Sequence, residues 1–209
     1  ILEVLKLSSC RIFQIPNTVP PWANTLRIIN FDGNFLSAVP QNIIAFPALE
    51  EATFFGNDIK KVKITKSTHP LRCLNLGMNP ISNATFHKGF KVTTLQLPFT
   101  RLGILDVMAY DGVKSLFLSH SMIDGTLDFA MPPSITMLDL SFNSIREFTP
   151  LFIQSIKNIT VLNVSHNCIT SIQDCFTEPV KLSQLDLSFN SLKTIPPSLL
   201  NSKSLERVS

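Results

Sequence analysis

The chain repeats one hydrophobic pattern along its length. Aligned on the template LxxLxLxxNxL, where x is any residue, nine segments match in register at spacings of 21–24 residues. Three of them are LRIINFDGNFL from Leu26, ITMLDLSFNSI from Ile135 and LSQLDLSFNSL from Leu182. Apolar and polar residues alternate in the centre of each segment, which predicts a short strand with one buried face.

A unit of this length cannot bury its own apolar side chains, so neighbouring units are expected to stack and share a core. Strands one repeat apart would then lie parallel, ~4.8 Å from one another, in a single sheet. The sequence therefore predicts one solenoid domain over residues 1–209, with nine full repeats and the start of a tenth. The repeats span residues 2–25, 26–48, 49–70, 71–91, 92–112, 113–134, 135–158, 159–181 and 182–204.

The ninth template position is an asparagine in six of the nine repeats. A buried amide at this point can hydrogen-bond the backbone where the chain leaves the strand, and stacked copies would form a ladder. We therefore assign these asparagines to the scaffold rather than to a ligand. They are Asn34, Asn57, Asn79, Asn143, Asn167 and Asn190. Cys10, Thr100 and Ser121 take the same place in the other three repeats.

The return segments between strands carry a second, weaker signal. Short helices are predicted at residues 41–45, 151–157 and 197–202, and irregular turns elsewhere. Prolines at a shared offset, as in Ile195-Pro196, turn the chain without losing a ladder hydrogen bond. Phe152, Phe176 and Leu199 share a later position and are expected to fill the core from the convex side.

These motifs resemble the leucine-rich repeat superfamily, and the resemblance covers essentially the whole chain. It extends loosely to the ectodomains of leucine-rich repeat receptor kinases and Toll-like receptors. The resemblance implies an α/β, β-dominated horseshoe with one parallel concave sheet of about ten short strands and irregular or short-helical convex segments. Because both ends lie inside the repeat array, we expect the chain to be an internal piece of a longer protein.

Composition and charge exclude several classes of function. The chain is 44% apolar, which is too high for disorder, and no apolar run approaches the ~18 residues of a membrane helix. A net charge of +3 is too small to indicate nucleic acid or an anionic membrane. The densest basic stretch, residues 60–66, is interpreted as a solvated convex face, with an acidic partner as the alternative. We expect neither nucleic-acid binding nor direct membrane insertion by this segment.

The residues that usually carry chemistry do not form a catalytic pattern. The four histidines are scattered, and no phosphate-binding glycine loop or hydrolase motif occurs. Asp139 and Asp186 share a template position, but only because LDLSFN itself recurs. We predict a segment that is not an enzyme and has no metal or cofactor, while a longer protein leaves room for a catalytic domain elsewhere.

The four cysteines form no CxxC pair and no metal-ligand cluster. Only Cys168 and Cys175 are close in sequence. A disulfide between them and a set of free thiols both remain open.

The side chains at template positions 3, 5 and 8 are predicted to project from the concave sheet and its edge. Apolar residues gather there in the middle repeats, as in a protein-binding surface. The candidate ligand-binding residues are Phe117, Met137, Met78, Phe99, Phe142, Val161, Gln96 and Asp139. Phe117 is the preferred hot spot, because strand alternation points it away from the core. For position 8 the alternative is a phenylalanine that packs between turns.

These observations predict a non-catalytic recognition module that binds a protein or peptide through its concave face. The family resemblance suggests the ligand-sensing part of a receptor-like protein, outside the cell or at its surface. The alternative is an intracellular scaffold or regulatory array attached to a signalling enzyme, hence cytoplasmic. Asn83, Asn158 and Asn163 lie in glycosylation sequons, a number that the abundance of Asn, Ser and Thr explains by chance.

Overall fold

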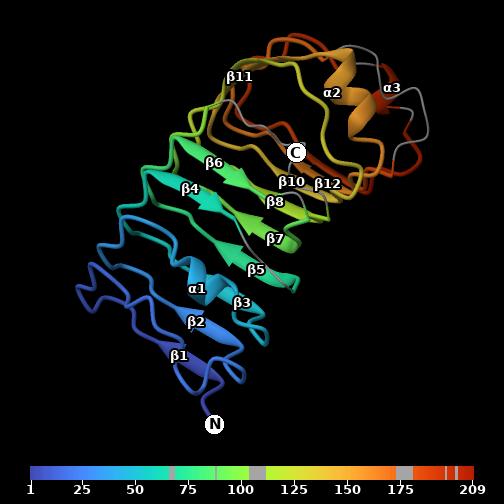
Figure 1. Cartoon of the computed structure of the whole chain (residues 1–209). Helices are drawn as coiled ribbons and strands as arrows, with labels where there is room; N and C mark the ends of the chain where they lie inside the picture. Colours follow the sequence, from blue (N-terminus) through green and yellow to red (C-terminus); the bar gives the residue numbers. More distant parts are fainter. Residues whose placement is uncertain (66–68, 88, 104–111, 173–180, 196, 201) are drawn as a thin grey trace.

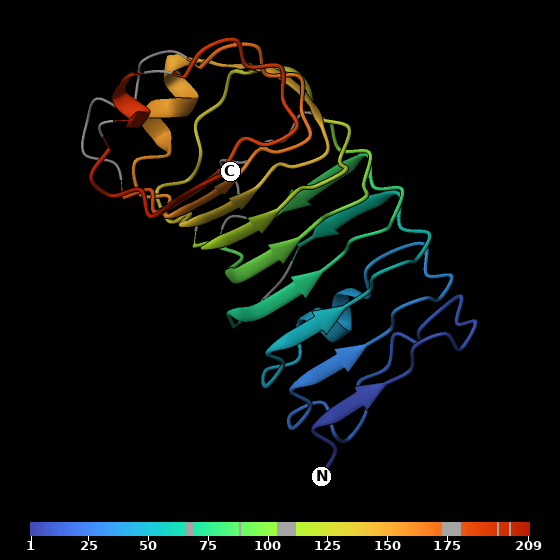
Figure 2. The ribbon, with the colours of Figure 1, turned by 180° about the vertical axis from the view of Figure 1, so that it is seen from behind.

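The computed structural model describes residues 1–209 except 66–68, 88, 104–111, 173–180, 196 and 201. The chain winds into a solenoid, and each turn adds one short strand to a ten-stranded parallel sheet (Figures 1 and 2). This architecture confirms the predicted horseshoe with one parallel sheet on its concave side. In spatial order the strands are β1 (Val4–Lys6), β2 (Ile28–Asn30), β3 (Glu51–Thr53), β5 (Leu71–Asn75), β7 (Val92–Gln96), β8 (Ser115–Phe117), β10 (Met137–Asp139), β12 (Val161–Asn163), β13 (Gln184–Asp186) and β14 (Arg207–Val208).

The register of the sheet follows the repeat template. Each strand pair aligns equal template positions, so that Leu116 lies beside Leu138 and Leu138 beside Leu162. These central leucines are at most 1% exposed, whereas the residues on either side of them are half-buried. One face of the sheet therefore builds the core and the other faces the concave side, as the alternation predicted.

The return segments contain three short helices where the sequence predicts them. They are α1 (Gln41–Ile44), α2 (Pro150–Ser155) and α3 (Pro197–Leu200) (Figure 1). Thr149 caps α2, because its hydroxyl accepts from the Phe152 N–H at 3.3 Å. Phe152 is fully buried and Leu199 is 7% exposed, so both fill the core as expected. Phe176 lies outside the described residues.

Two small parallel sheets correct the expectation of irregular turns. Strand β4 (Lys61–Ile64) pairs with β6 (Asn83–Phe86), and β9 (Asp124–Leu127) pairs with β11 (Ser144–Phe148). In each case two adjacent turns place extended return segments side by side. The basic stretch lies partly in β4, where its lysine side chains are exposed and its valine and isoleucine are buried. Lys66 lies outside the described part.

The six ladder asparagines bring polar groups to the core: Asn34, Asn57, Asn79 and Asn167 are buried, and Asn143 and Asn190 are half-buried. The Asn79 amide donates to the carbonyls of Phe54 and Leu76 at 2.9 and 3.0 Å, and its Oδ1 accepts from the Ile59 N–H at 3.0 Å. The other five make the same kind of bridge between their own turn and the one before. At two of the three substituted turns Thr100 and Ser121 are buried and donate to the Leu97 carbonyl.

The helices of the described part are short. None of them is long and apolar enough to cross a membrane.

Candidate functional site

The concave floor brings together five of the eight predicted binding residues. The register places Gln96 beside Phe117 on the next strand, and Phe117 beside Asp139. In the neighbouring column Met137 lies beside Val161. All five side chains are half-buried. The floor of the middle repeats is thus a shallow apolar surface bordered by an amide and a carboxylate.

The carboxylate and amide side chains at template position 5 also stabilise the turn that follows. Asp139 Oδ1 accepts from the Ser141 N–H at 3.0 Å, and Asn163 Oδ1 accepts from the N–H and hydroxyl of Ser165 at 3.0 and 2.8 Å. Such local hydrogen bonds are typical of Asn and Asp at turns. Asp139 therefore has one oxygen in a structural role, and within the described residues its other oxygen accepts no hydrogen bond.

Just beyond the C-terminal ends of the strands lies the rim, which we define as the nine residues at template position 8. Every one of them has a left-handed backbone, with φ between 52° and 65°. Glycine adopts this conformation freely, but for other residues it costs about 1–2 kcal/mol. The rim residues are Ser9, Gly33, Gly56, Met78, Phe99, His120, Phe142, His166 and Phe189.

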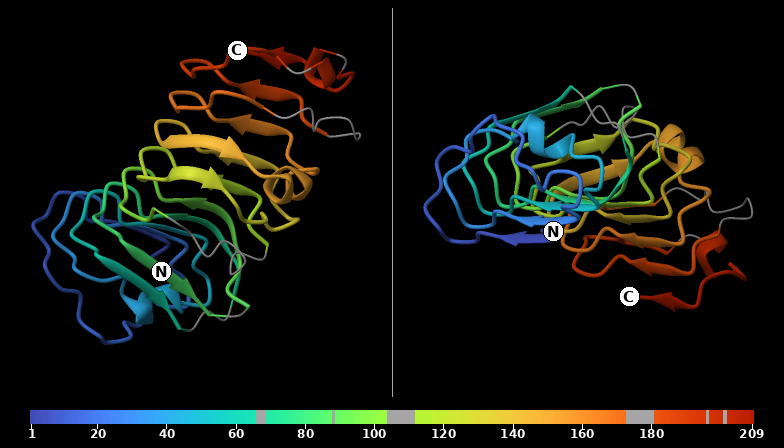
Figure 3. Two further views of the ribbon diagram at one scale, coloured as in Figure 1. Left: turned by 90° about the horizontal axis from the view of Figure 1, so that it is seen from above. Right: turned by 60° about the horizontal axis from the view of Figure 1, so that its bottom comes forward.

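The last five rim residues stack on one another as an alternating row of phenylalanine and histidine rings, the aromatic ladder. Ring centroids of neighbouring rungs are 4.2, 4.3, 3.9 and 4.1 Å apart, and the ring planes differ by 9–13°. Phe99, Phe142 and Phe189 nevertheless remain 52, 44 and 74% exposed, and Met78 is 58% exposed. The turns that carry these rungs succeed one another along the solenoid (Figure 3).

This arrangement changes which of the predicted binding residues are most accessible to a ligand. Met78, Phe99 and Phe142 were predicted with an alternative in which position 8 packs between turns. The two phenylalanines do pack between turns, but on histidines, and their edges stay in solvent. Among the predicted binding residues, the most exposed apolar side chains thus lie on the rim rather than at Phe117. The alternation of Phe and His at position 8 of five successive repeats is the sequence signal that could have indicated this ladder.

The opposite edge of the sheet is polar, and sequence reasoning missed it. At template position 2 the first four repeats carry Glu3, Arg27, Glu50 and Arg72. Arg27 donates to both oxygens of Glu50, at 2.7 and 3.1 Å, and Arg72 pairs with Glu51. The hydrogen bond from Arg27 lowers the pKa of Glu50 and raises the pKa of the guanidinium.

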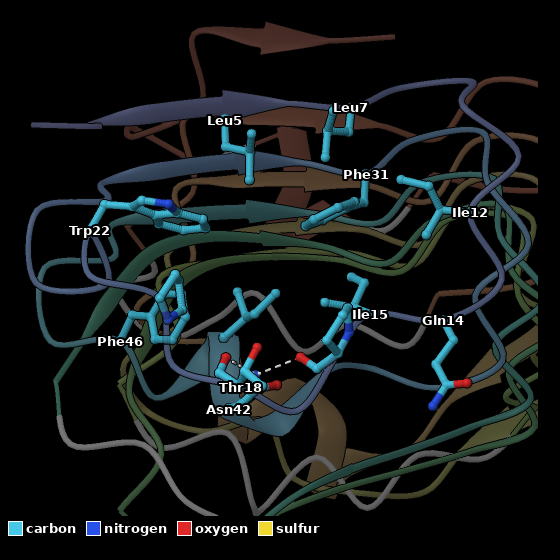
Figure 4. Close-up of a pocket in the computed structure, with 13 residues that line it drawn as sticks. Leu5, Leu7, Ile12, Gln14, Ile15, Thr18, Trp22, Phe31, Asn42 and Phe46 are labelled. Atoms are coloured by element: carbon cyan, nitrogen blue, oxygen red, sulfur yellow. Dashed lines mark hydrogen bonds between the residues drawn. The ribbon is translucent and has the colours of Figure 1, made fainter.

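An apolar pocket of about 410 Å³ opens inside the first coils (Figure 4). Leu5, Leu7 and Phe31 line it from the sheet, while Trp22 and Phe46 close one side. At its far wall the Asn42 amide donates to the carbonyls of Pro16 and Thr18, both at 3.3 Å. Leu5 of β1 and Leu7 are only half-buried, and Phe31 and Phe46 on the pocket wall belong to the hydrophobic core. The pocket is therefore an opening into that core.

The described residues offer no metal centre, because no group of three His, Cys, Asp or Glu side chains comes close enough. His120 and His166 are separated by the ring of Phe142. Cys10, Cys73 and Cys168 have free thiols, and burial raises the pKa of Cys73. Cys175 lies outside the described residues.

The predicted sequons occupy different surfaces. Asn83 is exposed at the start of β6. Asn158 is half-buried and donates to the Pro133 carbonyl at 3.2 Å. Asn163 lies on the concave sheet, with its Oδ1 engaged by Ser165. Of the three positions, only Asn83 is fully exposed in this structure.

Comparison with known proteins supports the repeat assignment. A leucine-rich repeat family model matches residues 133–192. The chain is similar to the leucine-rich repeat domain of APL1B, with 22% identity and a TM-score of 0.77 over 99% of this chain. It is also similar to a chain of the LRIM1/APL1C complex, with 22% identity and a TM-score of 0.76 over 99% of this chain.

A third similar structure is human 5T4, also called Wnt-activated inhibitory factor 1 or trophoblast glycoprotein. It is 18% identical, with a TM-score of 0.71 over 90% of this chain. The chain spans 63, 39 and 76% of these three structures, in the order given. No curated protein sequence matches it significantly. At these identities the likeness shows the fold.

Proposed function

Because the chain is a leucine-rich repeat solenoid, we propose that it is a non-catalytic recognition module that binds a protein or peptide ligand through its concave face. The observation that carries the proposal is the clustering of Phe117, Met137 and Val161 on adjacent strands. Elsewhere on a sheet face, a soluble protein exposes mostly polar residues. An apolar floor with polar borders is typical of a protein-binding surface.

The floor also differs between the two ends of the sheet. At template position 5 the first four repeats carry the polar residues Lys6, Asn30, Thr53 and Asn75. At that position the described part of the later repeats carries one apolar residue, Phe117, and Met137 and Val161 lie in the next column. The ligand therefore contacts the middle and C-terminal repeats, with Gln96 and Asp139 supplying hydrogen bonds at the border.

We further propose that the module is the ligand-sensing part of a receptor-like protein outside the cell or at its surface. Two of the similar structures belong to a two-protein complex, LRIM1/APL1C, and to a protein named as a glycoprotein, human 5T4. Under this proposal Asn83 is the sequon best placed for a glycan, because it is exposed and away from the concave floor. A glycan on Asn163 would obstruct the floor.

The second candidate is an intracellular scaffold or regulatory array attached to a signalling enzyme. The compact 21- and 22-residue repeats between residues 71 and 134 favour it. Expression in a glycosylating host separates the two candidates. A mass shift that disappears with Asn83→Gln supports the extracellular protein, and an unshifted mass favours the intracellular one.

The binding proposal is tested with ligands selected from a random peptide library against the whole chain. Affinities are then measured for the wild type, for Phe117→Asp and for Leu151→Asp. Leu151 is an exposed residue of the convex helix α2, so it controls for the same chemical change away from the floor. We expect at least about a tenfold loss for Phe117→Asp and none for the control. Unchanged affinity in a folded Phe117→Asp variant would remove the concave floor as the binding surface.

A further inference from the structure

We propose that the aromatic ladder is a docking surface for an acidic segment of a protein partner, seated on the rim beside the concave floor. The inference rests on the proposed recognition function and deepens it, because it names the contact surface and the chemistry of the partner. The ladder comprises Phe99, His120, Phe142, His166 and Phe189.

Exposed apolar surface is concentrated on the ladder. Its three phenylalanines are 44–74% exposed, and Met122 beside it is 65% exposed. By contrast, Phe117 and Met137 on the floor are half-buried. A contiguous exposed row of this kind on a soluble protein usually marks an interaction site.

The fold does not require aromatic rings at template position 8. Gly33 and Gly56 take the same rim position with φ of 63° and 65°, and Ser9 does so with 56°. The phenylalanine and histidine rungs adopt φ of 52–55°, a conformation that L side chains with bulky groups rarely occupy. Backbone strain retained at an exposed surface is an indication of function rather than of folding.

The ladder presents ring edges and imidazole N–H groups to a partner. The faces of the inner rings are covered by their neighbours, so the ring edges point to solvent. Aromatic ring edges are electropositive, and a neutral imidazole offers one N–H donor. Both features favour an acceptor-rich partner over a cationic one.

The charged residues on the outer flank of the ladder agree with this. Arg101 lies two residues after Phe99, and Lys193 lies four residues after Phe189. Both are exposed and form no ion pair within the described part of the chain. Between them, Arg146 lies 3.9 Å from Asp124, and Glu147 is exposed next to it. The flank therefore carries three cationic side chains against two carboxylates.

The acidic residues of the floor define which way the partner faces. Asp139 and Asp186 lie on the concave side of the rim, and each accepts from a serine N–H two residues on. A bound segment would place apolar side chains on the ladder and its carboxylates toward Arg101 and Lys193, away from the floor.

The test uses two fluorescein-labelled probes, Glu-Glu-Leu-Phe repeated three times and the same peptide with lysine in place of glutamate. Binding to the whole chain is followed by fluorescence anisotropy for the wild type, for Phe142→Gly, and for the double variant Arg101→Ser/Lys193→Ser. Glycine is compatible with the backbone at position 142, as Gly33 and Gly56 show at the same template position. The matched control is Phe13→Gly, which removes a 69% exposed aromatic residue from the first repeat.

We expect the glutamate probe to bind at least about tenfold more tightly than the lysine probe. Phe142→Gly and the double variant should each weaken the glutamate probe at least about fivefold, while Phe13→Gly leaves it unchanged. Circular dichroism confirms that each variant is folded.

Equal binding of the two probes, a preference for lysine, absent binding, or rim variants that bind like the wild type would overturn the inference. If peptide ligands still lose affinity with Phe117→Asp in that case, the concave recognition function stands and only the rim proposal fails.

Discussion

The rim of the first three repeats and the rim of the last five follow the same backbone path with opposite side chains. Ser9, Gly33 and Gly56 leave the first rim bare, at φ of 56–65°. From repeat five onward the same left-handed position carries large rings at φ of 52–55°. The turn geometry is therefore independent of the rings, and the rings are an addition to a scaffold that forms without them.

The rings of the ladder lower the free energy of unfolding through their backbone conformation and raise it through stacking. A left-handed conformation disfavours each of them by about 1–2 kcal/mol relative to glycine. Each stacked pair returns about 0.5–1.5 kcal/mol beyond its buried area. The two effects are of similar size, so the backbone conformation and the ring stacking nearly offset each other. The exposed edges of the ladder are then best understood as a surface for a partner.

The opposite edge of the sheet shows the reverse distribution. The first four repeats carry the ion pairs Arg27–Glu50 and Arg72–Glu51, whereas the later repeats carry mostly hydroxyls, such as Thr136 and Thr160, which donate to backbone carbonyls. The N-terminal half thus presents a charged edge and a bare rim. The C-terminal half presents a mostly hydroxyl edge, an apolar group of Phe117, Met137 and Val161 on the floor, and an aromatic rim.

The largest expected effect tests whether the asparagine ladder stabilises both halves of the solenoid. Asn57 and Asn167 are both buried, and each amide bridges two carbonyls and one N–H at 2.9–3.0 Å. Replacing either by alanine leaves these groups unsatisfied, and we expect a loss of about 3 kcal/mol in each half. Urea unfolding measures both. A loss in one half only would show that the amide ladder supports only part of the solenoid.

A medium effect is expected when a ring is placed on the bare rim. Gly56→Phe introduces a bulky residue at φ 65°, with Gly33 and Met78 in place of aromatic neighbours. A Cβ at Gly56 meets backbone atoms only at 3.7 Å or beyond, so the expected loss of about 1–2 kcal/mol comes from the backbone conformation. The unfolding midpoint measures it. A variant as stable as the wild type would mean that the left-handed position carries no penalty here.

A smaller effect is expected at the charged edge. Arg27→Met removes the hydrogen bond that lowers the pKa of Glu50, so this pKa should rise to its ordinary range, as measured by NMR titration. A lowered pKa in the folded state stabilises the protein above the ordinary pKa, and this contribution is lost as pH falls through the lowered value. The variant should therefore differ from the wild type at pH 7 and approach it as the pH falls below the lowered pKa of Glu50.

Lys193→Met serves as the control for this variant, because it removes an exposed cation that pairs with no carboxylate in the described ranges. It should leave the pKa of Glu50 unchanged. A difference between Arg27→Met and the wild type that persists at low pH would point to lost packing of the arginine stem instead.

The repeat pattern predicted the parts of the fold that depend on one turn alone. The strands follow from the alternation at positions such as Leu138, and helix α2 follows from the apolar spacing around Phe152. The pairings β4–β6 and β9–β11 were not predicted, because each requires the extended return segments of two adjacent turns to lie side by side in register. That condition depends on how neighbouring repeats stack and not on the sequence of a single repeat.

The site was predicted in part for a similar reason. The floor residues, including Phe117, follow from strand alternation. The left-handed turn that places Phe142 on the rim has no alternation to reveal it, and glycine marks it only at Gly33 and Gly56. Ring stacking between turns depends on which residue follows in the next repeat, which becomes visible only when the repeats are read as columns.

Whether the aromatic ladder is an addition to a self-sufficient scaffold is tested most directly by urea unfolding of variants at two neighbouring residues of one turn, Phe189 and Asn190. Phe189 is 74% exposed, and His166 is its one stacking partner among the described residues, whereas the Asn190 amide donates to the carbonyls of Val164 and Leu187 at 2.9 and 3.0 Å. We expect Phe189→Gly to change the unfolding free energy by less than about 1 kcal/mol, since relieved strain offsets the lost stacking. Asn190→Ala should cost about 3 kcal/mol. An equal or larger loss for Phe189→Gly would contradict the claim that the ladder is a surface added to a self-sufficient scaffold.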